Sequence, residues 1–156
     1  MTESGAMKIL VGFDGSANSK EALTWAVDEA SARGVAVEAM SVLQVPALAY
    51  GAPGYVPPTL ERFRDEMVLM VEEALEEAGR AHPGAAPVEL RAAEGAPAPV
   101  LAERAHQEDV IMVVVGARGH GVLTELMLGS ASHALSHKCP KPLVIVPHGW
   151  REKSAS

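Results

Sequence analysis

The sequence has almost no cysteine and no long apolar run. Cys139 is the only cysteine among 156 residues, so no disulfide can form within the chain and nothing in the cysteine content indicates an oxidising compartment. The longest strongly apolar stretch, residues 110–115, is far shorter than the roughly 20 residues that a membrane helix needs. Residues 1–7 contain no basic residue, unlike the start of a signal peptide. We therefore expect a cytoplasmic protein that has no membrane partner.

Basic residues are outnumbered, and they form no cluster. The chain has 13 Lys and Arg residues against 20 Asp and Glu residues, which gives a formal net charge of −7. Nucleic-acid affinity depends on grouped phosphate contacts from Lys and Arg, so nucleic acid is not an expected partner. A small anion needs only a few backbone N–H groups at one helix terminus, and ATP is therefore compatible with the negative charge.

The size and composition favour one folded domain. Hydrophobic residues make up 48% of the chain and charged residues 21%, as in ordinary soluble domains. A chain of this length buries roughly 70% of its unfolded surface around a single core. We expect a domain over residues 8–148, with flexible segments at 1–7 and 149–156.

Predicted strands and helices alternate along the chain. The expected strands are 8–13, 35–43, 88–92, 110–115 and 143–146; the expected helices contain 22–30, 59–78, 100–106 and 130–137. This alternation predicts a doubly wound α/β fold of the flavodoxin-like or Rossmann-like type, with a five-stranded parallel sheet in the order 3-2-1-4-5 and helices on both faces. Ligands of such sheets bind beyond the carboxyl ends of the first and fourth strands. Asp14 and Gly116 end those two strands.

The segment between the fourth strand and the fourth helix is rich in glycine. Gly116, Gly119 and Gly121 permit positive φ angles and a close approach of a ligand to the backbone. Gly129 and Ser130 are expected to present free N–H groups at a helix N-terminus, where phosphate is favoured. The same glycines also suit a simple connection from strand to helix, and composition alone does not decide between the two interpretations.

The spacing of these residues favours the first interpretation. Gly116-x2-Gly119-x9-Gly129-Ser130 resembles the ATP-binding signature of the universal stress protein family. Three other segments resemble that family in the same order: KILVGFDGS at 8–16, Gly95-x-Pro97, and PLVIV at 142–146. The resemblance covers nearly the whole chain. The sequence departs from the family at the proline-rich loop after Leu43 and at His120.

The resemblance implies ATP as the ligand, with Mg²⁺ as a candidate companion and AMP or ADP as alternatives. It places Asp14 near the ribose, and it gives the backbone of Val42 to adenine. The residues implied around the ligand are Gly12, Asp14, Val42, Gly116, Arg118, Gly119, Gly129, Ser130, Ala131 and Ser132. It also implies a homodimer through the edge strand Leu143–Val146, whose apolar edge invites pairing.

The expected function is that of an ATP-binding universal stress protein, a nucleotide-responsive regulator and not an enzyme. A slow ATPase or nucleotidyl hydrolase on the same fold is the alternative, and a flavin or electron-transfer module is a third hypothesis. The sequence favours the regulator because it has no G-x4-G-K-[ST] loop, no lysine in the glycine segment and no evident water-activating pair.

Other residues have two interpretations each. His133 and His137 stand at a spacing that suits a metal, but the glutamate of an H-E-x-x-H motif is absent, which favours a structural role. Arg118 is expected to neutralise phosphate or to form a salt bridge. Tyr50 and Tyr55 lie in the proline-rich loop, where they either cover a bound base or belong to a disordered segment.

Overall fold

The computed structural model, which describes residues 5–118 and 128–151, contains one five-stranded parallel sheet. The strands are β1 (Lys8–Gly12), β2 (Ala36–Leu43), β3 (Val88–Glu94), β4 (Val110–Gly116) and β5 (Leu143–Val146). Their order across the sheet is β3-β2-β1-β4-β5, and every neighbouring pair is parallel. The predicted strand order is confirmed, so β1 and β4 lie side by side at the switch point.

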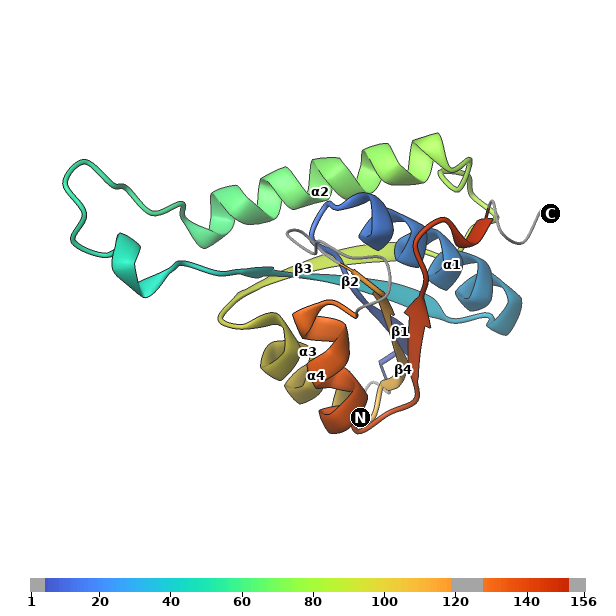
Figure 1. Cartoon of the computed structure of the whole chain (residues 1–156). Coiled ribbons are helices and arrows are strands. Elements are labelled where there is room, and N and C mark those ends of the chain that lie inside the picture. The colour runs from blue at the N-terminus through green and yellow to red at the C-terminus, as the bar shows by residue number, and fades with distance from the viewer. Residues whose placement is uncertain (1–4, 119–127, 152–156) are drawn as a thin grey trace.

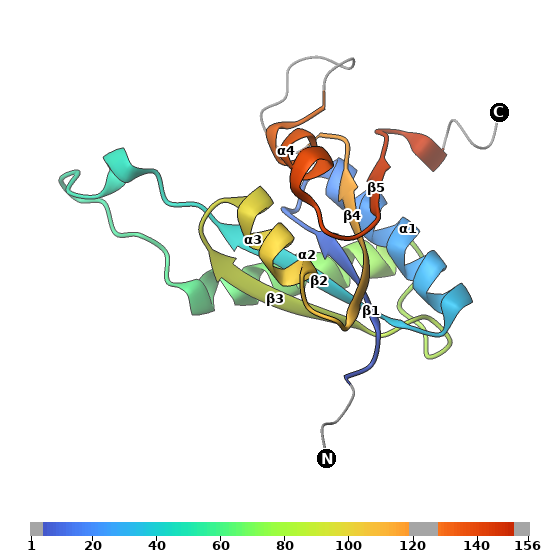
Figure 2. The same ribbon diagram turned by 90° about the horizontal axis from the view of Figure 1, so that it is seen from below.

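Helices cover both faces of the sheet. They are α1 (Ala17–Arg33), α2 (Leu60–Glu77), α3 (Pro97–Ala105), α4 (Ser130–Lys138) and the short 3-10 helix η1 (Ala47–Ala49). Helices α1 and α2 lie on one face, and α3 and α4 lie on the other (Figure 1). Figure 2 views the domain from the side of α3 and α4. Among residues 5–118 and 128–151, no helix is long and apolar enough to cross a membrane.

The central strands are apolar on both faces because each face has its own core. In β1, Ile9 and Val11 pack under α1 and α2, whereas Leu10 packs under α3 and α4. In β4, Val114 packs on the side of α1 and α2, and Val113 packs on the side of α3 and α4. Side chains alternate between the faces of a strand, so a strand that is buried twice needs a continuous apolar run.

Local signals fix most helix ends. Ser16 caps α1, its Oγ accepting from the Ser19 N–H at 3.2 Å, and Gly34 ends α1 with a φ of 69°. Helix α3 begins at Pro97, three residues before the predicted start at residue 100. The prediction excluded the prolines from the helix, but proline is tolerated in a first turn, where its missing N–H has no partner to lose.

Two segments lie outside the layered body. The segment between β2 and α2, residues 45–58, projects away from the domain in both views, and we call it the arm (Figure 1 and Figure 2). Beyond β5, the chain turns back onto α1, where the Gly149 N–H donates to Glu21 Oε2 at 3.0 Å. Trp150 packs against the core beneath α1 and α2, and Arg151 Nη2 lies 3.7 Å from Asp28 Oδ2, so residues 149–151 of the predicted tail dock on the domain.

Candidate functional site

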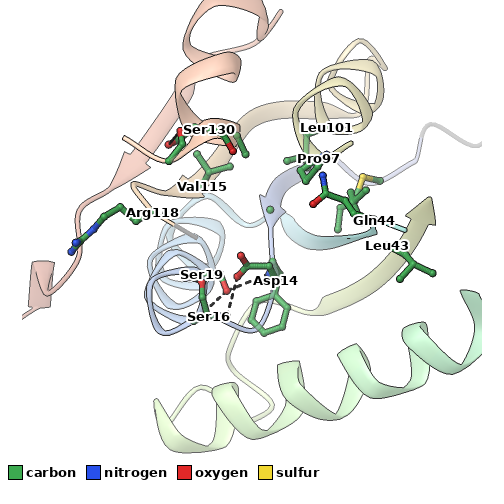
Figure 3. A pocket seen from close by; sticks show the side chains of 18 of the residues that line it. Asp14, Ser16, Ser19, Leu43, Gln44, Pro97, Leu101, Val115, Arg118 and Ser130 are labelled. Carbon is green, nitrogen blue, oxygen red and sulfur yellow. Dashed lines mark hydrogen bonds between the residues drawn. The ribbon is translucent and has the colours of Figure 1, made fainter. Parts of the chain in front are cut away.

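A cavity of about 390 Å³ opens at the carboxyl ends of β1, β2 and β4 (Figure 3). The starts of α1, α3 and α4 form its sides, and α2 contributes Phe63. Its lining consists of Gly12, Phe13, Asp14, Ser16, Ser19, Met40, Val42, Leu43, Gln44, Phe63, Pro97, Leu101, Val115, Gly116, Arg118, Gly129, Ser130, Ala131 and Ser132. Six separate parts of the chain therefore meet at the edge where doubly wound sheets bind ligands.

Nine of the ten residues predicted for the ligand site line this cavity. The tenth, Gly119, lies outside the described residues, as do Gly121 and His120. The structure also adds lining residues that the sequence did not indicate. Several adjoin a strand end that did carry a signal, such as Phe13 and Gln44, but Phe63 comes from a helix with no local signal for a site.

The turn between β1 and α1 is held by hydrogen bonds and by α2. Asp14 Oδ1 accepts from the Ser16 N–H at 2.9 Å, which closes an Asx-type turn at the cavity wall. Gly15 has a φ of 81°, and a Cβ there would lie 2.6 Å from Met70 Cε of α2. Any other residue at position 15 would meet both the strained conformation and the methionine.

Gly116 lines the cavity, but it does not have the positive φ angle that the sequence analysis allowed for. Its φ is not positive, so no left-handed conformation requires glycine there. The requirement comes from α1: a Cβ at residue 116 would lie 2.8 Å from Asn18 Cγ and 3.0 Å from the Asn18 backbone oxygen. The absence of a side chain lets the start of α1 approach the end of β4.

Asn18 joins two strand ends beneath the cavity. Its Nδ2 donates to the Val146 carbonyl at 3.1 Å, and its Oδ1 accepts from the Arg118 N–H at 2.8 Å. The residue is 4% exposed, and its bond to Val146 is buried away from competing water. Nothing in the sequence singled out this asparagine, because its partners are distant in the chain.

The start of α4 differs from the prediction in one respect. The N–H of Gly129 is not free, because it donates to the Ala117 carbonyl at 2.7 Å. The Ser132 hydroxyl is also engaged: its single O–H is shared between Ala117 O at 2.9 Å and Gly129 O at 3.0 Å. Gly129 is the N-cap and has no side-chain cap. The N–H groups that the helix leaves without an intrahelical partner are those of Ser130, Ala131 and Ser132, which follow the cap.

The backbone of Val42 points towards the cavity side of β2. Phe13 N–H donates to Met40 O at 2.9 Å, so the backbone groups of Met40 face β1. Gly95 N–H donates to Leu43 O at 3.1 Å, so those of Leu43 face β3. Orientation alternates along a strand, and Val42 therefore presents its N–H and C=O on the side of β1. Strand β1 ends at Gly12, opposite Met40, so Val42 extends beyond it.

Charged groups are few in the cavity wall. Asp14 and Arg118 are the ionisable residues of the lining listed above. The Arg118 side chain extends away from Asp14 and Ser130 (Figure 3), and within residues 5–118 and 128–151 it forms no ion pair. On α4, the exposed rings of His133 and His137 lie 5.1 Å apart. No group of three or more metal-ligating side chains occurs in the described part of the chain.

Comparison with known proteins identifies the family. The model of the universal stress protein family matches residues 5–147. The chain belongs to this family. Among curated relatives, a universal stress protein of Mycolicibacterium smegmatis is 34% identical over 90% of the chain and 48% of its own length. Universal stress protein YxiE of Bacillus subtilis is 32% identical over 89% of the chain and 97% of its own length.

Several of these universal stress proteins are longer than the chain. It spans about half the length of the first mycobacterial relatives that it matches. Solved structures share its fold at low identity. One, described as a structure-based assignment of the function of hypothetical protein MJ0577, has a TM-score of 0.68 at 20% identity, covering 92% of the chain and 96% of its own. A universal stress protein solved in complex with cAMP has a TM-score of 0.63 at 23% identity, covering 92% and 98%.

Proposed function

We propose that the chain binds an adenine nucleotide, with ATP as the first candidate, and acts as a nucleotide-responsive regulator of the stress response. The observation that carries the proposal is the Val42 backbone, whose N–H and C=O face the cavity where β1 has ended. An N–H and a C=O side by side complement the N1 acceptor and N6 donor of adenine. Guanine presents a donor and an acceptor in the opposite arrangement, so the same edge disfavours it.

The start of α4 suits the phosphates. The N–H groups of Ser130 and Ala131 belong to the first turn of the helix, and both residues line the cavity. Unpaired N–H groups and the helix dipole favour an anion at this position without any lysine. A local site of this kind binds an anion despite the net charge of −7.

The ligands of two neighbours support an adenine nucleotide. One universal stress protein structure is described as a complex with cAMP, and another, from Archaeoglobus fulgidus, as a complex with dAMP. Both ligands join adenine to a phosphate through a sugar. The adenine edge and the helix terminus of this cavity match those two ends, and a longer phosphate chain extends the contact with α4.

The wall also favours retention of the nucleotide over its rapid hydrolysis. Phosphoryl transfer needs a positioned water and neutralised γ-phosphate charge. Asp14 is the only carboxylate in the described lining, and its Oδ1 is engaged with the Ser16 N–H. If bound ATP is not hydrolysed quickly, the occupied fraction of the protein follows the concentration of the nucleotide. Slow hydrolysis on the same site is the alternative, and turnover measurements distinguish it.

Replacement of Gly129 tests the site. The φ of −63° and ψ of 162° at Gly129 are accessible to valine, so Gly129→Val retains the helix start while placing a branched side chain in the cavity wall. We expect calorimetry to show at least tenfold weaker ATP binding. Gly5→Val is the matched control, because a Cβ at Gly5 meets no atom within 4 Å. Unchanged ATP affinity in a folded Gly129→Val protein would exclude this phosphate site.

A further inference from the structure

The arm is the most exposed part of the described chain. Residues 50–62 are exposed without interruption. The arm displays apolar side chains to solvent: Leu48 is 95% exposed, Val56 84% and Tyr50 65%. It contains no charged residue, in a chain whose net charge is −7. Apolar side chains that are gathered and exposed in this way indicate a surface that becomes covered in another state.

The arm is also constructed as a unit. The described backbone hydrogen bonds of residues 46–55 stay within the arm: Ala49 to Pro46, Tyr50 to Ala47, Ala52 to Ala49 and Tyr55 to Ala52, at 2.9 to 3.3 Å. The sheet pairing of β2 stops at Leu43. Rotation about the segments that follow Leu43 and precede Thr59 therefore leaves the sheet ladder, the arm's turns and α2 intact.

Both ends of the arm are anchored in the wall of the nucleotide cavity. Leu43 and Gln44 precede the arm and line the cavity. Phe63, in the first turns of α2 after the arm, lines it as well. A ligand that contacts either wall therefore acts directly on a root of the arm, and no long-range pathway is needed to connect the two.

A second hollow lies between the arm and residues 94–96, and it shares two lining residues with the cavity. It has a volume of about 600 Å³ and is bounded by Leu43 and Gln44, which it shares with the nucleotide cavity, and by Tyr50 of the arm. Leu43 and Gln44 directly follow Val42, the residue that faces adenine in the proposed function. Tyr50 thus lines a hollow that shares Leu43 and Gln44 with the cavity in which the base is proposed to lie.

We propose that the arm is a lid on the nucleotide site, and that Tyr50 and Tyr55 cover the bound adenine when it closes. This inference rests on the proposed function. Closure would bury the exposed tyrosine rings and one face of the base together, and stacking of a base on an aromatic ring contributes favourably whatever the base edge binds. An uncharged arm also approaches the nucleotide without repelling its phosphates. The position of the arm, open or closed, would then depend on whether nucleotide is bound, and it would change the surface of the protein accordingly.

Limited proteolysis tests the lid. Chymotrypsin cleaves after Tyr and Leu, and Leu48, Tyr50 and Tyr55 are exposed in the arm. We expect saturating ATP to slow cleavage at Tyr50 and Tyr55 at least tenfold. Trypsin is the control: the arm has no Lys or Arg, and tryptic cleavage at Arg33, exposed at the end of α1 away from the cavity, reports stabilisation outside the arm. If ATP slowed tryptic cleavage to the same degree as chymotryptic cleavage in the arm, the protection would be general and the lid would be overturned.

Two variants separate the tyrosines from the fold. Tyr50→Ser combined with Tyr55→Ser should weaken ATP binding about tenfold, the scale of a lost base–aromatic stack, and leave the affinity for ribose 5-phosphate unchanged. Leu69→Ser is the control, because Leu69 is 65% exposed on α2 outside the arm. The lid would be overturned if the double variant bound ATP as tightly as wild type. It would also be overturned if, without ATP, protection of the arm against chymotrypsin rose with protein concentration, because the arm would then be covered by a second copy of the chain. Failure of ATP to bind wild type would overturn the proposed function as well, whereas binding with unprotected tyrosines overturns the lid alone.

Discussion

Asn18 Oδ1 accepts a hydrogen bond from the backbone N–H of Arg118 at 2.8 Å, although the two residues are 100 positions apart. The same amide donates to Val146 O, so one side chain fixes the exit of β4 relative to the end of β5. We expect Asn18→Leu, which keeps the volume and removes both bonds, to lower the free energy of unfolding by about 1–3 kcal/mol. The Arg118 N–H then loses its partner, and the Val146 carbonyl keeps only the bond from the Ala117 N–H. Urea unfolding measures this change. An unaltered midpoint would show that water replaces both bonds.

Gly116→Ala tests the approach of α1 to β4. The new Cβ would lie 2.8 Å from Asn18 Cγ, closer than real Cβ contacts, so α1 must shift. We expect destabilisation of about 1–3 kcal/mol, the usual range for overpacking, together with weaker ATP binding. Gly84→Ala is the control, since its nearest neighbour is the His82 side chain at 3.4 Å. Thermal unfolding of the two variants gives the comparison, and equal melting temperatures would contradict the packing argument.

A homodimer is predicted through β5. Ala117 N–H donates to Val146 O, so the backbone groups of Val146, and by alternation those of Val144, face β4. Those of Ile145 then face the open edge. Ile145→Pro removes an outward N–H and leaves the β4 ladder intact, and we expect light scattering to shift from dimer to monomer. An unchanged dimer would place the interface on another surface.

The Glu38–Arg104–Asp109 cluster predicts acid sensitivity. The hydrogen bond from the Arg104 guanidinium lowers the pKa of Asp109 from its ordinary 3.8, and Lys8 adds to the effect. Because the folded state holds this proton less tightly than the unfolded state, the contribution to stability is present above the ordinary pKa and is lost as the pH falls below it. Asp109→Asn should cost about 1 kcal/mol at pH 7 and less at pH 3. Urea titrations at the two pH values test this, and an equal loss at both would exclude the charge as the cause.

Hydrolysis of ATP, if present, should be slow. With Mg²⁺ and excess ATP, we expect turnover well below the ordinary enzyme range of about 1–1,000 per second, because Asp14 is the only carboxylate in the described wall and is already engaged. Phosphate release under multiple-turnover conditions measures it. A rate within that range that disappears in Gly129→Val would replace the regulator by an ATPase.

The sequence predicted the strand order and the location of the cavity because both depend on local patterns. The run at 110–115 has no polar face, and such a strand belongs at the centre of a parallel sheet. The glycine spacing then placed the site at the end of that strand. These signals concern residues that are close together in the chain, where composition and periodicity carry information.

The details that the sequence did not predict depend on partners from distant segments. Gly116 has the right residue type for a reason that appears only when Asn18 lies against it. The Gly129 N–H is bound to Ala117, which no spacing rule indicates. Phe63 lines the cavity because α2 crosses the β1–α1 turn, and the amphipathic pattern of α2 predicts a buried face without saying what it covers.

The amide of Asn18 also ties the first helix to a segment that is synthesised late. Its donor bond spans 128 positions, from the first turn of α1 to the last residue of β5. A growing chain that has produced the glycine segment and the start of α4 still lacks the strand end to which Asn18 is tied. We therefore expect the cavity to assume its final form only after residue 146 has left the ribosome, and a chain truncated before β5 should not protect its cavity residues from hydrogen exchange.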